Sequence, residues 1–385
     1  MLDWVNARRT ATRACAGICF FTLSVPAAQA APADPGAKKN TDYAVAYQIN
    51  PAHSGSITLK DFTTPLTKLW SVNLGTSLSY ALVVENLVIV NGANDVTYAL
   101  ALASGTTKWS KTSGSSLVGL AYDNRSIFLV TGGGLMSRLS AKSGAQVWSV
   151  QLPDQYAFSS APIAMDDQVF TGGAGDGGTL YAVSESSGAV QWTQSVQNGD
   201  NSSPAYGDHG IYVSYPCQYY KFNPSSGSQD WNYNGGCEGG GGNTPAYFGG
   251  NVYVQDWTSG NYVLNAATGA VTGTFGADNG LTPAFYGTTK KGYGFSLSQG
   301  TLYGWKTSTD TNIWTFTGDG QLSTAAIVIN DMVVEGSQSG EVYALDAKSG
   351  QEMWSANSGA GVTSLSAGQN TLIVVSGNIV TAYGP

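Results

Sequence analysis

This sequence of 385 residues has few charged side chains, and the acids outnumber the bases by 25 to 17. Only 11% of the residues carry a charge at neutral pH. A chain with this acidic balance is a poor candidate for binding nucleic acid or an anionic membrane surface. It also has no run of eighteen apolar residues, so the sequence predicts no membrane-spanning helix.

Cysteine is scarce, and the four cysteines fall into two pairs. Cys15 and Cys19 lie within a short apolar stretch, away from a small-residue cleavage position, which argues against a lipid anchor. Cys217 and Cys237 are the remaining pair, and in an oxidising compartment an even pair indicates one disulfide. No C-x-x-C motif occurs, so we expect a structural rather than a redox role for this pair.

The first thirty residues have the pattern of a secretory signal. Arg8, Arg9 and Arg13 precede the apolar stretch of residues 16–25, and an A-x-A cleavage pattern ends at Ala30. The sequence therefore predicts a signal peptide followed by an exported protein, either periplasmic or secreted.

In contrast to these scarce residue types, aromatic residues recur at a regular spacing. Seven tryptophans follow one another at intervals near forty residues once Phe275 is placed in the one vacant slot. The markers are Trp70, Trp109, Trp148, Trp192, Trp231, Phe275, Trp314 and Trp354. A period near forty residues is the signature of a repeat array in which each repeat is one supersecondary unit.

Each repeat reads as two β-hairpins. The closing half has a short apolar strand, a Ser-Gly turn and a second strand that ends at the tryptophan, as in residues 343–354. Glycine four residues before the tryptophan supplies the positive φ of a tight turn. The opening half contains a strand of alternating apolar residues, such as residues 86–90. Four short strands in forty residues predict one propeller blade.

The two ends of the chain complement each other. The residues after Trp354 supply three strands, and residues 57–70 match a closing half. We therefore expect a composite eighth blade, which removes the free sheet edges of an open array. The predicted fold is all-β, an eight-bladed β-propeller of four-stranded antiparallel blades over residues 45–385, with a flexible segment at residues 31–44. A seven-bladed ring and an open solenoid are the alternatives.

The pattern A-x-D-x-x-S/T-G-x-x-x-W stands in full at residues 344–354. It resembles the tryptophan-docking motif of eight-bladed propellers of the quinoprotein type, named for pyrroloquinoline quinone (PQQ). The resemblance covers roughly residues 45–385 and implies that the eight aromatic markers stabilise contacts between blades. This repeat occurs in PQQ-dependent alcohol and sugar dehydrogenases. It also occurs in non-catalytic members, including the propeller lipoprotein of the outer-membrane β-barrel assembly machine, which binds partners.

Strand order predicts which loops share a face. The connection that leaves each tryptophan strand and the turn between the second and third strands lie together, on what we call the top face; the other two turns form the bottom face. Extra length falls on the top face, and so do both mature cysteines, Cys217 and Cys237. Candidates for binding a ligand or partner there are Asp154, Tyr156, Asp176, Asp200, Glu238, Trp257, Asp278 and Asp319.

The acids among these candidates admit two interpretations. An arc of carboxylates around a central opening would bind Ca²⁺ or attract a basic partner. Alternatively, they are ordinary polar loop residues. The chain's two histidines suggest no site, since His209 falls in a bottom-face turn and His53 forms no triad or ligand pair that spacing reveals.

The sequence favours one function and leaves two alternatives open. Blades of near-minimal length and few titratable groups favour an exported, monomeric, non-catalytic scaffold that binds a protein or a small ligand through its top-face loops. The first alternative is a PQQ-dependent alcohol or sugar dehydrogenase, for which the resemblance implies PQQ and Ca²⁺ as cofactors. Those enzymes use adjacent cysteines and a catalytic Asp, and no motif places a catalytic residue here. The second alternative is a propeller that binds or cleaves carbohydrate.

Overall fold

The computed structural model describes residues 42–385 apart from 115, 176, 198–201, 216, 237–243, 257–259, 278–279 and 289–290. All helix or strand structure in the described residues is β-strand. No helix in this part of the chain is long and apolar enough to cross a membrane.

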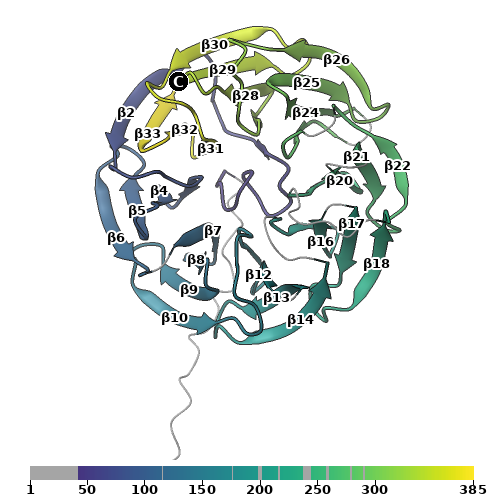
Figure 1. Ribbon diagram of the computed structural model, residues 1–385. Helices are drawn as coiled ribbons and strands as arrows, with labels where there is room; N and C mark the ends of the chain where they lie inside the picture. The colour runs from purple at the N-terminus through teal and green to yellow at the C-terminus, as the bar shows by residue number, and fades with distance from the viewer. Residues whose placement is uncertain are drawn as a thin grey trace, which may run out of the picture. The chain divides into compact units, whose positions relative to one another are not determined.

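The strands form eight four-stranded blades arranged in a ring (Figure 1), as the sequence predicts. Blade 1 is β3(Leu82–Val84), β4(Leu87–Asn91), β5(Val96–Ala101) and β6(Thr107–Thr112). Blade 2 is β7(Leu117–Asp123), β8(Ser126–Thr131), β9(Leu135–Ser140) and β10(Gln146–Gln151). Blade 3 is β11(Ile163–Met165), β12(Gln168–Gly175), β13(Gly177–Ser184) and β14(Val190–Val196). Blade 4 is β15(Ala205–Gly207), β16(Gly210–Tyr215), β17(Gln218–Phe222) and β18(Gln229–Asn234).

Blade 5 is β19(Ala246–Phe248), β20(Asn251–Asp256), β21(Gly260–Asn265) and β22(Val271–Thr274). Blade 6 is β23(Ala284–Tyr286), β24(Tyr293–Ser298), β25(Thr301–Lys306) and β26(Thr311–Phe316). Blade 7 is β27(Ile327–Ile329), β28(Met332–Gly336), β29(Glu341–Asp346) and β30(Glu352–Asn357). Blade 8 is β31(Ser364–Gly368), β32(Thr371–Ser376) and β33(Ile379–Gly384), completed by β2(Thr67–Asn73) from the other end of the chain.

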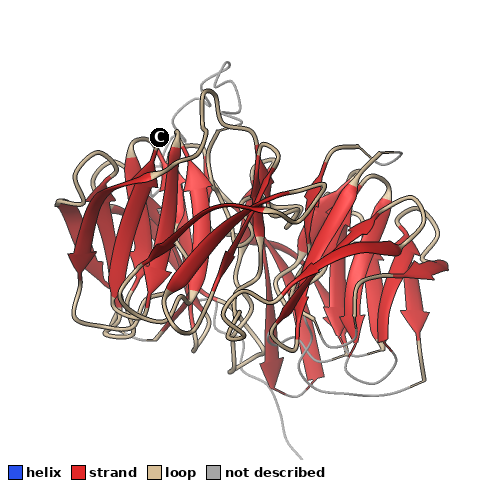
Figure 2. Ribbon diagram, turned by 90° about the horizontal axis from the view of Figure 1, so that it is seen from above, coloured by secondary structure: helices blue, strands red, loops and turns tan. Residues whose placement is uncertain are grey.

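The core lies between neighbouring blades. Second strands such as β4 are buried at every residue, because both faces of each blade are covered by another blade. Fourth strands such as β30 alternate between exposed and half-buried residues. The strands run from one face of the ring to the other, with loops on both sides (Figure 2).

The ring closes through blade 8, as predicted. In its outer strand, β2, Trp70 pairs with Ala382 of β33 in an antiparallel ladder. The match of residues 57–70 to a whole closing half is wrong in its first part, because Ile57 does not belong to blade 8. It lies in β1(Ser56–Ile57), which pairs in parallel with β27 of blade 7.

The marker tryptophans connect each blade to the next. Each indole Nε1–H donates to a backbone carbonyl three residues before the turn glycine of the following blade, or to the equivalent carbonyl of Leu66. The seven acceptors, in the order of the donors, are Leu102, Ala141, Glu185, Pro224, Ala266, Ala347 and Leu66, at 2.6–3.2 Å. The turn glycine lies against the indole ring: a Cβ on Gly144 would stand 2.7 Å from Trp109.

The interface between blades 5 and 6 departs from this pattern at three positions together. Phe275 replaces the tryptophan, and Asp310, with φ of 51°, takes the place of the turn glycine. Trp305 of β25 is fully buried and lies 5.4 Å from Phe275 between ring centroids. A buried indole from the next blade thus fills the space that the smaller phenyl ring leaves.

Candidate functional site

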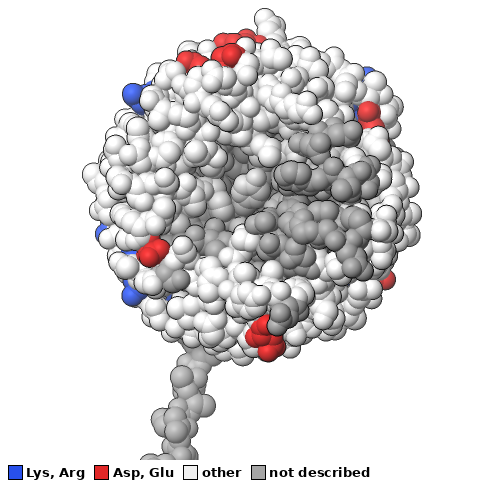
Figure 3. Space-filling view, in the orientation of Figure 1, with Lys and Arg blue, Asp and Glu red and all other residues white. Residues whose placement is uncertain are grey.

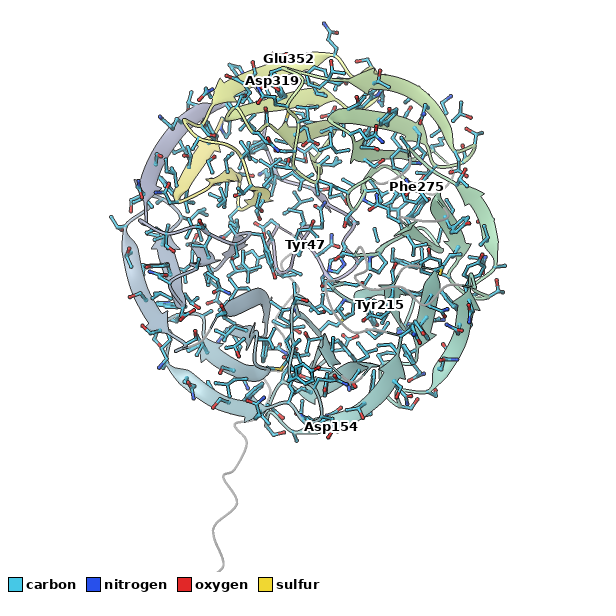
Figure 4. All side chains as sticks on the ribbon, in the orientation of Figure 1. Tyr47, Asp154, Tyr215, Phe275, Asp319 and Glu352 are labelled. Carbon is cyan, nitrogen blue, oxygen red and sulfur yellow. The ribbon has the colours of Figure 1, made fainter. Side chains whose placement is uncertain are left out.

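The predicted top-face candidates are only partly among the described residues. Asp154, Tyr156 and Asp319 are described, whereas Asp176, Asp200, Glu238, Trp257 and Asp278 lie outside the described residues. Figure 4 places Asp154 and Asp319 at opposite sides of the ring, so the structure does not bring these two carboxylates together.

Tyr156 is presented on a firmly held loop. Strands β12 and β13 are eight residues long, and Ala157 extends their sheet by a bridge to Ala174. Phe158 anchors the same loop, being only 4% exposed. The Tyr156 side chain remains 69% exposed, and its ring lies over Gly175. An amphipathic ring on an ordered loop costs little conformational entropy to bind, which suits a protein contact.

Asp319 lies in the connection from β26 to β27 and is hydrogen-bonded to residues of blade 7. Its carboxylate accepts hydrogen bonds from the Ser337 hydroxyl at 2.7 and 2.9 Å, from the Ser339 hydroxyl and from the Gln321 backbone N–H. Burial alone would raise the pKa of the Asp319 carboxyl, but these hydrogen bonds outweigh it and lower the pKa. The carboxylate therefore fixes a loop of blade 7.

Figure 3 shows this face hollowed near the axis, with Lys and Arg confined to the rim and Asp and Glu in isolated groups. Among the described residues, no group of three or more His, Cys, Asp or Glu is arranged to hold a metal ion. The described residues thus provide no Ca²⁺ site of the kind that the quinoprotein resemblance implies.

Cys217 lies at the top of blade 4, buried and with φ of 53°. It is disulfide-bonded. Its predicted partner, Cys237, lies outside the described residues, so the pairing stays a prediction.

Sequence reasoning missed the occupant of the propeller axis. Residues 42–57, which we call the axial strap, run through the centre of the ring (Figure 1). The expected flexible segment overlaps the strap at residues 42–44, and there Ala44 is fully buried and hydrogen-bonded to Val83 of β3. Figure 4 places Tyr47 of the strap at the centre.

The strap contacts the blades one after another in ring order. Backbone N–H groups of seven blades donate to its carbonyls. In ring order, the donors are Gln369, Val83, Tyr122, Tyr206, Tyr247, Phe285, Val328 and Asn330. Their acceptors, in the same order, are Asp42, Ala44, Val45, Pro51, Ala52, Ser54, Gly55 and Ile57. In the remaining blade, blade 3, Ile163 and Met165 share a buried cluster with Ala46. The strap thus covers the inner edges of seven blades, and each of these hydrogen bonds contributes roughly 0.5–1.5 kcal/mol.

A buried polar network holds the strap. His53 is 0% exposed, and its Nδ1 lies 3.1 Å from the Pro245 carbonyl oxygen, which accepts only, so Nδ1 carries the proton. Its Nε2 faces the Ser203 hydroxyl at 3.3 Å. Burial lowers the pKa of His53 to about 4, against the opposing effect of the Pro245 bond. The ring is therefore neutral at pH 7.

Two buried carboxyls lie away from the strap. Glu335 of β28 is 0% exposed, and burial raises its pKa to about 8 despite hydrogen bonds from the hydroxyl and N–H of Thr324 and the N–H of Gly336. Glu185 of blade 3 is 3% exposed, and burial followed by the charge of Asp123 raises its pKa to about 8. Nothing in the sequence distinguished these two acids from surface ones.

The surface turn expected around His209 is observed. His209 is exposed between β15 and β16, on the bottom face, where it helps to line a cavity of about 150 Å³ between blades 3 and 4. The hydroxyl of Tyr206 donates to Asp166 at 3.1 Å at this place. The cavity is too small for a drug-sized ligand.

Comparison with known proteins places the fold. The family model described as outer membrane protein assembly factor BamB matches residues 65–177, 176–274 and 259–384. No curated protein sequence matches the chain. Among solved structures, BamB from Moraxella catarrhalis is similar with a TM-score of 0.68 and 18% identity, over 83% of this chain and 100% of that one.

Two dehydrogenase structures are similar in fold to the same degree. The quinohemoprotein alcohol dehydrogenase from Comamonas testosteroni has a TM-score of 0.71 and 13% identity, over 90% of this chain and 81% of its own. A europium-containing methanol dehydrogenase has a TM-score of 0.72 and 14% identity, over 90% of this chain and 99% of its own. At such identities the likeness concerns the fold alone.

Proposed function

We propose that this chain, which belongs to the family described as outer membrane protein assembly factor BamB, is a non-catalytic propeller that binds a protein partner through its top face. The observation that carries the proposal is the family match, which spans all eight blades from residue 65 to residue 384. The dehydrogenases share only the fold with it.

The top face is the surface that best fits this role. Tyr156 is the most exposed large hydrophobic side chain among the described residues, and it stands beside Asp154 on the ordered loop between β10 and the extended hairpin of blade 3. Interfaces are enriched in tyrosine at their energetic centres, and an acid beside that tyrosine, here Asp154, favours encounter with a basic partner. The axial strap covers the inner strand edges, so the loops supply the contact.

The proposal includes export. The N-terminal signal pattern, the disulfide at Cys217 and the context of the family name support an oxidising compartment outside the cytoplasm. The family name further suggests a partner in the outer membrane assembly pathway of the cell that makes this protein.

The test is site-specific photo-crosslinking in the native cell envelope. A photoreactive amino acid replaces Tyr156 on the top face in one strain and His209 on the bottom face in another. We expect a discrete crosslinked protein from position 156 and none from position 209, and we expect Asp154→Asn to weaken the crosslink. Equal crosslinking from both positions, or none from either, would contradict a top-face scaffold.

The dehydrogenase alternative is tested separately by a thermal-shift titration of residues 31–385 with PQQ, with and without Ca²⁺. A scaffold gives no shift. A Ca²⁺-dependent rise in the unfolding temperature would mean that the native state binds the quinone, and would replace the proposed function with the enzymatic one.

A further inference from the structure

The axial strap has the contacts of a bound peptide rather than of a blade. Its backbone carbonyls receive N–H groups from the inner edges of seven blades, and its one strand is the two-residue β1. Between these contacts the strap folds back on itself, because the N–H groups of Val45 and Ala46 donate to the Ile49 carbonyl and the N–H of Gly55 donates to the Gln48 carbonyl. An edge strand that accepts an extended chain by backbone hydrogen bonds is a recurring mode of peptide recognition. Here the strand edges that donate N–H groups are arranged in a circle, and one peptide binds them one after another.

Side chains of the strap add selectivity to these backbone contacts. Gln48 donates from Nε2 to the carbonyls of Thr282 and Ala326, both at 3.2 Å, while His53 lies between Pro245 and Ser203. These partners belong to the segments that lead into the inner strands of blades 4 to 7.

Close packing restricts what fits at the far end of the strap. Gly55 has φ of +64°, and a Cβ there would stand 2.6 Å from the Cβ of Ala284. The site therefore requires a residue without a side chain at this point, next to the carbonyl that accepts from Val328.

The connection between the strap and β2 is exposed at two residues that lie between the buried side chains of Leu59 and Phe62. Lys60 and Asp61 have side chains 89% and 82% exposed, and they lie between β1 and β2. A cut at this place separates the strap from the strand that closes blade 8 without touching any contact described above.

From these contacts we propose that the axis of the propeller is a binding site for a folded-back peptide, and that residues 42–57 are its resident ligand, held in cis. The site binds backbone carbonyls along the whole segment and, in chain order, the side chain of Gln48, the ring of His53 and the bare α-carbon of Gly55. This inference is independent of the proposed partner at the top face.

The experiment is a peptide exchange. The recognition sequence of a specific protease is inserted between Lys60 and Asp61 of the mature protein, and cleavage leaves the strap held by noncovalent contacts alone. A fluorescent peptide of residues 42–60 is then added in excess and incubated below the unfolding temperature. Its incorporation is followed by gel filtration, with circular dichroism to verify that the propeller stays folded.

We expect the labelled peptide to replace the resident strap, to saturate at one peptide per propeller, and to be displaced by unlabelled peptide. A Gly55→Ala peptide should incorporate at least tenfold less well, whereas a Lys60→Ala peptide, changed outside the site, should match the original. Hydrogen exchange at the amides of Tyr206, Tyr247 and Phe285 should be slow with peptide present and fast after it is removed.

Three outcomes would overturn the inference. In the first, the cleaved strap does not exchange while the propeller stays folded, which makes it a permanent part of the fold. In the second, the propeller unfolds as the strap leaves. In the third, the Gly55→Ala peptide enters as readily as the original, so that no shaped site exists.

Discussion

Acidification should destabilise this protein through His53. The imidazole has an ordinary pKa near 6.5 in the unfolded chain, and burial lowers its pKa to about 4 in the folded one. Between these values the unfolded state binds a proton that the folded state does not. The free energy of unfolding therefore rises with pH across this window. The contribution of His53 to it is lost as the pH falls from about 7 to 4.

The size of the effect follows from the two pKa values. A difference of about 2.5 pKa units at about 1.4 kcal/mol each gives roughly 3 kcal/mol by pH 4. This figure needs no reduction for solvent screening because His53 is 0% exposed and the described groups around it, Tyr47, Ser203 and Pro245, carry no charge.

The assay compares urea unfolding of the wild type and of His53→Gln from pH 7.5 to pH 4. Other acids also titrate in this range, so the difference between the two proteins is the quantity to follow. We expect the wild type to lose about 3 kcal/mol relative to the variant. His209→Gln, in an exposed turn, is the matched control and should run parallel to the wild type. Parallel curves for His53→Gln as well would refute the argument that burial keeps this histidine neutral.

Three further predictions follow from the packing. Glu335 has a raised pKa, so its contribution to the free energy of unfolding is complete below about pH 4.5 and is lost as the pH rises toward 8. Glu335→Gln should remove this loss, up to about 4 kcal/mol, in unfolding titrations between pH 5 and 8.5. Trp109→Ala should cost about 3–5 kcal/mol in urea unfolding, and Gly144→Ala should cost more than Gly114→Ala, because both glycines have positive φ but only Gly144 faces an indole. Reduction of the disulfide at Cys217 should lower the free energy of unfolding by about 3 kcal/mol, and a thiol assay that finds two free cysteines before reduction would disprove the predicted pairing with Cys237.

The blades were predictable because their contacts repeat. Trp148 and Gly188 lie at a fixed separation from the same strands in successive repeats, and the structure places that ring against that glycine. The substitution of Phe275 was visible in the sequence, but its compensation by Trp305 was not, because the two residues belong to different repeats and meet only across an interface.

The strap escaped prediction for a physical reason. Its main contacts are backbone hydrogen bonds, which leave no side-chain periodicity to read. One signal was available: residues 43–49 are almost entirely apolar or aromatic, although they precede the first repeat. A segment of that composition needs burial, and a closed ring of blades offers it only at the axis or between blades. His53 was likewise judged by its lack of catalytic neighbours, whereas its environment is set by residues about 150 and 190 positions away.

The strap also explains how the backbone N–H groups on the inner strand edges of the ring find hydrogen-bond partners. Closing a sheet into a ring of blades removes the edges between repeats, but it leaves the innermost strand of each blade unpaired on the axis side. These edges have the same orientation and lie in chain order round the ring, so a single segment that travels round once pairs with seven of them and shares a buried cluster with the eighth. In this chain the segment is residues 42–57, which lead within ten residues to β2, the strand that closes the ring. The family match begins at residue 65, after the strap, so the repeats and the segment that caps them are separate parts of the sequence. Because the strap meets the inner strands beside their bottom-face turns, it covers the axis on that side. The top face, where the blades differ in length, is therefore the face left for the partner that we propose.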